Sequence, residues 1–240
     1  MKFAIFGDIH ANLEALEAIL LDAADQDCTH FTCIGDIVGY NANPRECLRV
    51  VQQLDCPVVK GNHDEEASMD TEIVGLNPLA QRALEWTREA LSASDKEWLQ
   101  DLRFVRQVRD FTIVHATLDS PSGWNYVTNK FDAMASFAYQ FTPVCFFGHT
   151  HTPRFYVKDT GVQLEIGDTI RLEEGKKYFI NVGSVGQPRD GDWRCSYAVY
   201  DVDNQTVTVR RLDYDIKKTQ EKILKAGLPE MLANRLTLGK

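Results

Sequence analysis

Histidine and aspartate residues stand in closely spaced pairs directly after short apolar segments of the sequence. In FFGHTHTP, His149 and His151 flank a single threonine, and in FGDIH the pair is Asp8 and His10. Residues two apart on an extended backbone point to the same side. Imidazole nitrogens and carboxylate oxygens are ligands of transition-metal ions. The two pairs therefore predict a metal centre in which both imidazoles of the His-x-His pair are ligands.

Three further apolar segments end in residues of the same kinds. Asp36 follows one segment, Asn62 and His63 follow the next, and His115 follows the third. The carboxyl ends of parallel strands form the ligand crevice of an open α/β sheet, so we expect all five ends to converge. Glycine precedes the polar residues at four ends, where it permits close backbone approach. Five of the six histidines lie at these ends, and the other, His30, is interpreted as structural.

A structural explanation competes with the metal-binding interpretation. A single histidine at the end of a strand is more often a hydrogen-bonded structural residue than a ligand, and Gly-Asp is common in turns. That explanation must hold separately at each of the five ends. Buried charges without partners are costly, whereas a metal ion compensates them directly. We therefore favour the metal site.

The elements that must position these residues begin with alternating strands and helices. Strand-like segments at 3–6 and 31–34 are each followed by apolar residues at helical spacing, and a third strand is predicted from Pro57. Such alternation is typical of βαβ units and a largely parallel sheet that is buried on both faces.

The rest of the sequence predicts a helical insertion, a strand-rich half and a helical tail. The insertion covers about 64–102, with helix starts at Asn77-Pro78 and Ser94-Asp95. One helix is expected at 131–141, and the tail covers about 215–240. Strands are predicted at 104–108, 111–115, 144–147, 154–158, 178–182, 197–202 and 206–211.

The composition describes a chain long enough to bury its own core. It has 240 residues, 44% of them hydrophobic, a formal net charge of −9 and six scattered cysteines, which we expect to be free thiols. One domain, residues 1–240, is expected. The sequence has neither a run of about 18 apolar residues nor a signal peptide, which predicts a cytoplasmic location without a membrane partner. No cluster of Lys and Arg supports extended nucleic-acid binding, although a small anionic substrate is compatible with local charge.

The order of the motifs resembles a known family. GDIHAN, GDIVGY, GNHD, the strand-end His-Ala and GHTH are similar to the motifs of the calcineurin-like metallophosphoesterase superfamily, and they extend over residues 7–192 with NVGSVGQPRDGD. GDIVGY and NVGSVGQPRDGD resemble the small bacterial and archaeal phosphodiesterase-like branch. The resemblance implies an α/β fold, a four-layer α/β/β/α sandwich, with two metal ions at the strand ends.

The resemblance also implies a role for each candidate residue. One ion would be held by Asp8, His10 and His151, the second by Asn62, His115 and His149, and Asp36 would bridge both. His63 would contact the substrate phosphate and assist the leaving group. Four imidazoles favour manganese, iron, zinc or nickel over calcium and magnesium.

Charge and geometry suggest how such a site would hydrolyse a phosphate ester. Two divalent ions, two aspartates and a bridging hydroxide leave a net charge of about +1, which attracts an anion. Direct attack by that hydroxide needs no protein nucleophile. The sequence has no GxSxG motif and no cysteine constellation that would favour a covalent route. His63 would act as a general acid or charge stabiliser, a role commonly worth about 10²–10⁴-fold.

Several other residues have two interpretations. Asn12 caps the first helix or contacts phosphate, and Arg189, in a glycine-rich loop, clamps phosphate or serves the turn. Asp64 orients His63 or is an exposed helix-starting residue. Trp124 and Tyr126 stack on a nucleobase or pack their loop against the protein.

We expect a metal-dependent phosphodiesterase that acts on small phosphate esters or nucleotides. A phosphomonoesterase or a dinucleoside polyphosphate hydrolase is the alternative within enzymes. A different class is a metal-binding scaffold for protein interaction, like the retromer subunit of this fold. The presence of His63 with all seven ligands disfavours the scaffold. The β-rich second half offers an edge at which oligomers could form.

Overall fold

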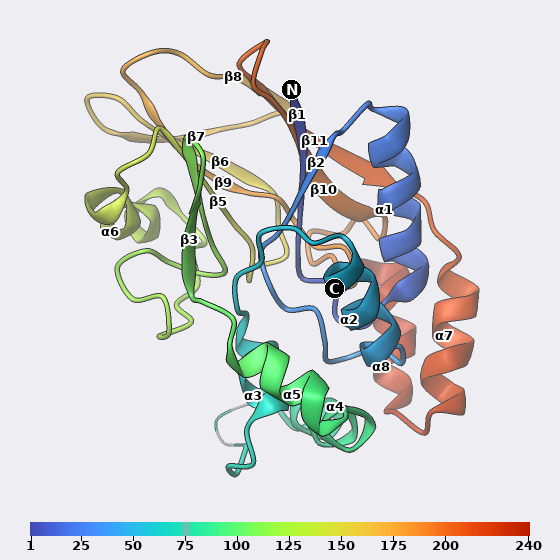
Figure 1. Ribbon diagram of the computed structural model, residues 1–240. Helices are drawn as coiled ribbons and strands as arrows, with labels where there is room; N and C mark the ends of the chain where they lie inside the picture. Colours follow the sequence, from blue (N-terminus) through green and yellow to red (C-terminus); the bar gives the residue numbers. More distant parts are fainter. Residues whose placement is uncertain (74, 76) are drawn as a thin grey trace.

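Two β-sheets form the centre of the fold in the computed structural model, which describes residues 1–73, 75 and 77–240 (Figure 1). The first sheet has the order β2-β1-β10-β11-β8, with bounds His30–Cys33, Lys2–Phe6, Cys195–Asp201, Thr206–Leu212 and Thr169–Arg171. The second has the order β3-β4-β5-β9-β6-β7, with bounds Val105–Val108, Phe111–Val114, Val144–Phe147, Lys177–Asn181, Arg154–Lys158 and Val162–Glu165.

The two sheets pack face to face between helices. Along β1, Phe3 and Ile5 enter the core between the sheets, while Ala4 and Phe6 belong to the core under the helices, as the two-residue period of a strand requires. Helices α1 (Leu13–Asp25) and α2 (Pro44–Gln53) cover the first sheet. Helix α6 (Lys130–Tyr139) covers the second, where Phe137 packs near Phe179. The predicted four-layer α/β/β/α sandwich is confirmed.

The expectation of a largely parallel sheet in the first half is wrong. Strands β1 and β2 are parallel, but β1 pairs with β10 in the antiparallel direction, and β11 and β8 continue antiparallel. The parallel strands β4, β5 and β9 lie in the second sheet. An apolar run reports burial on both faces, and it carries no information on the direction of its neighbour.

The predicted strand from Pro57 is also corrected. Val58 and Val59 form only isolated parallel bridges, to Cys33 and Arg103, because the chain turns into a helix three residues later. The short strands β7 and β8 were missed in the sequence since most of their residues are exposed and show no apolar pattern.

Both segments predicted to be helical contain helices. The insertion holds α3 (Asn62–Ser68), α4 (Pro78–Ala90) and α5 (Ala93–Gln100). The Asn77 side chain accepts from the backbone N–H of Ala80 as predicted, whereas α5 is capped by Ser92 and not by Ser94. The tail holds α7 (Ile216–Lys225), α8 (Glu230–Asn234) and the 3₁₀ helix η1 (Arg235–Leu238).

Further expectations concern the chain as a whole. All six cysteines are free thiols, as predicted. In the part of the chain that the structure describes, no helix is both long and apolar enough to span a membrane. The assignment of all residues to one domain stays a prediction.

Candidate metal centre

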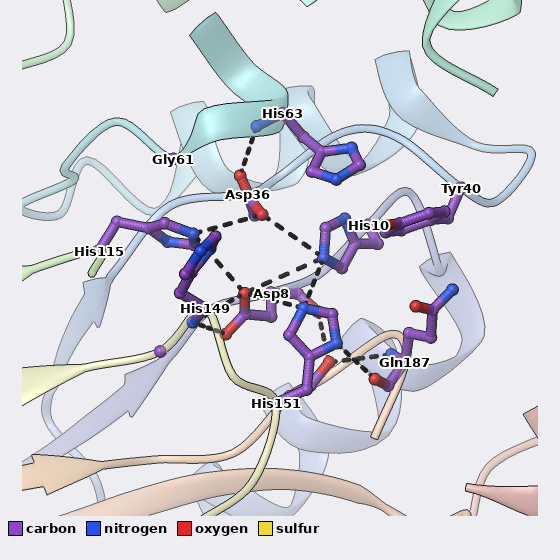
Figure 2. Close-up of polar contacts among 12 residues, drawn as sticks. Asp8, His10, Asp36, Tyr40, Gly61, His63, His115, His149, His151 and Gln187 are labelled. Carbon is purple, nitrogen blue, oxygen red and sulfur yellow. Dashed lines mark hydrogen bonds and ion pairs between the residues drawn. The ribbon is translucent and has the colours of Figure 1, made fainter. Parts of the chain in front are cut away.

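Acidic and histidine side chains from distant segments meet beyond the ends of β1, β2, β4 and β5 (Figure 2). They fall into two groups of potential ligands, each with its ligand atoms within 4.8 Å of one another. The first group is Asp8, His10, Asp36 and His151, and the second is Asp36, His115 and His149. The predicted convergence is confirmed, and Asp36 belongs to both groups.

Each of the four imidazoles in these groups has one ring nitrogen hydrogen-bonded to a backbone carbonyl oxygen. The pairs are His10 Nδ1 with Val38 O (3.1 Å), His115 Nδ1 with Ile34 O (2.8 Å), His149 Nε2 with Trp124 O (2.9 Å) and His151 Nδ1 with Gln187 O (2.5 Å). A carbonyl oxygen only accepts, so the contacting nitrogen must be the donor N–H. The second nitrogen of each neutral ring then carries a lone pair. This arrangement of donor and lone pair is typical of metal-ligating histidines.

Several buried atoms of the cluster have no hydrogen-bond partner among the described residues. They are Asp36 Oδ2, Asn62 Oδ1 and His115 Nε2. Asp36 Oδ2 lies 3.5 Å from His10 Nε2 and 3.3 Å from His115 Nε2. Buried polar atoms without partners are rare because they are costly. Divalent ions would satisfy all three at once, so these residues fit the metal that the fold family implies.

Two glycines let the backbone approach the carboxylates. A Cβ atom added to Gly61 would lie 2.1 Å from Asp36 Oδ1, and one added to Gly148 would lie 2.3 Å from Asp8 Oδ2. The segment before Asn62 is thus packed directly against Asp36. The close approach predicted from the glycines is confirmed at both positions.

Five cluster residues adopt left-handed backbone conformations. The φ angles are 48° at Asp8, 46° at His10, 51° at Asp36, 66° at His149 and 57° at His151. Such angles cost about 1 kcal/mol or more per residue and concentrate at functional sites. The predicted extended backbone is therefore wrong for both i, i+2 pairs. His149 and His151 also belong to different groups of potential ligands.

Burial sets the protonation of most imidazoles. It lowers the pKa of His149 to about 3 and lowers the pKa values of His10 and His151 well below the usual 6.5. Burial acts the same way on His115, but the carboxylates of Asp36 and Asp8 raise its pKa to about 9. Neutral imidazoles are the form that binds metal, so binding of an ion at His115 would require its ring to release its second proton.

His63 lies beside the cluster with its ring against His10 and Tyr40, at centroid distances of 4.7 and 4.5 Å (Figure 2). Its backbone N–H donates to Asp36 Oδ1 (2.8 Å), and its Nδ1 has no partner. Burial lowers the pKa of His63 to about 4. The histidine is therefore neutral near pH 7 and has an unused ring nitrogen.

Asp64 lies in the first turn of α3, as the second interpretation expects, but it is fully buried and not exposed. Its carboxylate accepts from the backbone N–H groups of Ile37 (2.8 Å) and Gly61 (3.1 Å). It joins the loop after β2 to the start of α3 and makes no hydrogen bond to His63 among the described residues.

Asn12 and Arg189 occupy different surroundings. The Asn12 side chain caps α1 by accepting from the backbone N–H of Ala15 (3.2 Å), as predicted, and its Nδ2 donates to Gly186 O (3.1 Å). Because Asn12 is fully buried, these contacts favour capping over a contact with substrate. Arg189 donates its backbone N–H to His151 O (3.2 Å), and its guanidinium donates to the hydroxyl of Tyr40 (3.3 Å), whose ring packs against His10.

The two aromatic residues after His115 also differ. Trp124 donates its Nε1–H to Glu65 Oε2 (3.1 Å) and packs near His115, with ring centroids 5.8 Å apart. Tyr126 is 56% exposed and lies over the His149 ring at 4.3 Å. Trp124 therefore packs its loop, whereas Tyr126 presents an accessible ring beside the cluster.

The comparisons with known proteins decide the family. The calcineurin-like phosphoesterase superfamily domain matches residues 1–205. The chain belongs to the calcineurin-like phosphoesterase superfamily. This phosphoesterase is similar to a metallophosphoesterase from Sphaerobacter thermophilus, whose crystal structure superposes with a TM-score of 0.89 at 39% identity over 100% of this chain and 99% of that one. Membership and this neighbour make it a metal-dependent phosphoesterase.

Two further relatives match this phosphoesterase over nearly their whole length, and a third matches about half of this chain. An uncharacterised protein of Methanocaldococcus jannaschii is 36% identical over 99% of this chain and 98% of its own. A hypothetical protein from Pyrococcus horikoshii shares the fold, with a TM-score of 0.84 at 18% identity over 100% and 98% of the two chains. A symmetrical bis(5′-nucleosyl)-tetraphosphatase of Coxiella burnetii is 32% identical over 50% of this chain and 43% of its own.

Proposed function

We propose that this phosphoesterase is a dinuclear phosphodiesterase of small phosphate esters or nucleotides. The observation that carries the proposal is the position of Asp36, whose carboxylate belongs to both ligand groups and has one oxygen without a hydrogen bond. A carboxylate shared by two groups of imidazole and carboxylate ligands is suited to bridge two cations. Sites of this kind, with ions about 3.5–4 Å apart, hydrolyse phosphate esters.

The two ligand groups support one ion each. Asp8, His10 and His151 would hold the first ion, Asn62, His115 and His149 the second, and Asp36 both. Nitrogen-rich ligands favour manganese, iron, zinc or nickel. When bound, such ions polarise a phosphoryl group and lower the pKa of water.

His63 is proposed to act on the leaving group. Its ring is neutral in the free protein, so its N–H can donate a hydrogen bond to the leaving oxygen, whereas transfer of a proton requires the ring first to gain one from solvent. An incoming phosphate anion raises the pKa of a nearby imidazole, which would favour proton transfer as the P–O bond breaks. Arg189, whose backbone N–H donates to His151 O, is proposed to bind phosphate of the substrate.

The principal alternative is a dinucleoside polyphosphate hydrolase. The similarity to a bis(5′-nucleosyl)-tetraphosphatase over half of the chain favours it, and Tyr126 offers an exposed ring on which a base could stack. A phosphomonoesterase is the third candidate. A metal-binding scaffold is disfavoured because His63 is placed beside the cluster with an unused nitrogen.

A substrate panel with metal analysis tests the proposal. We expect two ions per chain and hydrolysis of bis(p-nitrophenyl) phosphate in preference to p-nitrophenyl phosphate. Diadenosine tetraphosphate as the preferred substrate would favour the alternative. His151→Ala and His115→Ala should each lose one ion, and Asp36→Ala should weaken both. Stoichiometric metal without hydrolysis in manganese, iron, zinc or nickel would point to the scaffold.

Two expectations outside the site belong to the same proposal. We propose a cytoplasmic location and no extended nucleic-acid partner, in line with the net charge of −9. Cell fractionation tests the location. Sedimentation analysis tests whether the chain forms oligomers.

A further inference from the structure

Two arginines from distant parts of the chain lie against the same aromatic ring. The guanidinium carbons of Arg189 and Arg235 are 5.7 and 6.0 Å from the centroid of the Tyr40 ring. Tyr40 in turn lies edge-on to the ring of His10 at 4.7 Å and contacts His63 (Figure 2). The Tyr40 ring therefore lies between the two positive charges and the candidate metal centre.

Contacts of the C-terminal tail with the rest of the protein fix the position of Arg235. Leu236, the residue after it, joins a buried cluster with Tyr40 and with Ala83 of α4. The end of the tail is fixed to the loop after Arg189, because the backbone N–H of Gly191 donates to Gly239 O (3.0 Å). The family match ends at residue 205, so Arg235 comes from a segment that lies beyond the matched domain.

Neither guanidinium has an Asp or Glu partner among the described residues. Among the described residues, Arg189 donates only to neutral groups, Gln187 Oε1 (2.8 Å) and the Tyr40 hydroxyl (3.3 Å). Arg235 donates its Nε–H to an oxygen of Lys240, the last residue of the sequence, and no other hydrogen bond or ion pair of its side chain occurs in the described chain. Both side chains are half-buried. Burial and the charge of Arg189 lower the pKa of Arg235, as expected for like charges in proximity.

A buried donor without a partner lies next to this pair. Gln187 is 1% exposed, its Oε1 accepts from Arg189, and its Nε2 makes no hydrogen bond. Two half-buried guanidinium groups and an unused amide N–H form an anion-binding environment, since phosphate accepts several such donors at once.

We propose that Arg189 and Arg235, with Gln187 Nε2, bind a second phosphoryl group of the substrate, distinct from the one that reacts. The inference rests on the proposed function and narrows its substrate class to phosphate esters that carry another phosphate, such as nucleoside polyphosphates. Simple diesters with a single charge would leave Arg235 unused. The tail is then a specificity element, and Arg235 is a substrate-binding residue that takes no part in the chemical step.

Calorimetric binding of ADP and AMP tests the proposal without turnover. The two probes share the nucleoside and differ by one phosphate, and free manganese is held at a buffered excess. We expect the wild type to bind ADP more tightly than AMP. Arg235→Gln should reduce that preference by roughly tenfold, the loss expected for one charge-assisted hydrogen bond. Arg235→Lys should restore part of it, because lysine keeps the charge without the planar fork.

Lys225→Gln is the matched control, because Lys225 is an exposed cation of the same tail and has no polar side-chain contact among the described residues. Chelation of manganese by ADP is the same for every variant, so differences between variants come from the protein. If Arg235→Gln and Lys225→Gln show the same preference for ADP over AMP and the same unfolding midpoint, the proposal that Arg189 and Arg235 bind a second phosphoryl group is overturned. The titrations are repeated on metal-stripped protein and compared with the substrate panel, so that the two proposals can fail separately. If Arg235→Gln loses the preference for ADP but the wild type hydrolyses no phosphate ester, only the proposed function is overturned.

Discussion

The Nε2 atoms of His10 and His151 lie 3.0 Å apart, and neither nitrogen carries a hydrogen that it could donate to the other. Each ring uses its Nδ1–H on a backbone carbonyl oxygen, so both Nε2 atoms carry lone pairs that face one another. Two acceptors at this distance repel. A cation between or beside them would turn the repulsion into attraction, which explains why two buried neutral imidazoles are held in this orientation.

Removal of metal should therefore destabilise the fold. A ligand at 100 times its Kd stabilises the native state by about 2.7 kcal/mol, which corresponds to roughly 5–10 °C in Tm for a chain of this size. We expect chelation to lower Tm by at least this range and added manganese or zinc to restore it. Differential scanning calorimetry with and without chelator measures the effect, and an identical Tm in both would contradict the metal centre.

The stability of the metal-free protein should depend on pH in a defined direction. Burial lowers the pKa of His63 to about 4 and of His149 to about 3, while the same groups titrate near 6.5 in the unfolded chain. Below that value the unfolded chain binds more protons, so stability falls as pH decreases. His10 and His151 act in the same direction.

His115 has the opposite sign. Its folded pKa of about 9 means that its contribution is complete below pH 6.5 and is lost as pH rises through 9. Burial also raises the pKa values of Asp8 and Asp64, which favours the folded state as pH falls. The four histidines with lowered pKa values still outnumber these two acids and His115, so the loss of stability on the acid side should be the larger. Urea unfolding of chelated protein between about pH 4.5 and pH 9 measures the profile. A stability that does not fall below pH 6.5 would contradict the burial of these imidazoles.

His63→Ala should impair turnover without loss of metal. Because the ring lies beside the cluster and its backbone, not its side chain, contacts Asp36, both ions should remain bound. General acid assistance is commonly worth about 10²–10⁴-fold, so kcat should fall by that range. His30→Ala serves as the control for loss of a histidine away from the cluster. Unchanged kcat at full metal content would remove His63 from the mechanism.

The residues of the candidate site can be predicted from the sequence more fully than the order and direction of the strands. Asp8, Asp36 and His115 follow apolar strands immediately, and strand ends can be located from composition alone. The pairing of β1 with β10 depends on residues about 195 positions away, which no local pattern reports. Gln187 and Tyr40 were not assigned roles for the same reason, since their importance comes from neighbours such as Arg235 in the distant tail. The left-handed backbone at His149 was also missed, because αL conformations are expected at glycine and not at histidine.

Gly61→Ala should disrupt the metal centre by a purely steric route. A Cβ atom at this position would lie 2.1 Å from Asp36 Oδ1 and 2.4 Å from the backbone nitrogen of Asp36, and neither neighbour is the flexible end of a long side chain. The substitution must displace the carboxylate proposed to bridge the ions. We expect weaker binding of both metals and a loss of activity comparable to that of Asp36→Ala, measured by metal analysis and by hydrolysis of bis(p-nitrophenyl) phosphate. Gly161→Ala is the matched control, since a Cβ at Gly161 meets nothing within 4 Å. Normal metal content in Gly61→Ala would show that Asp36 can move without loss of the ions, and the bridging role would have to be abandoned.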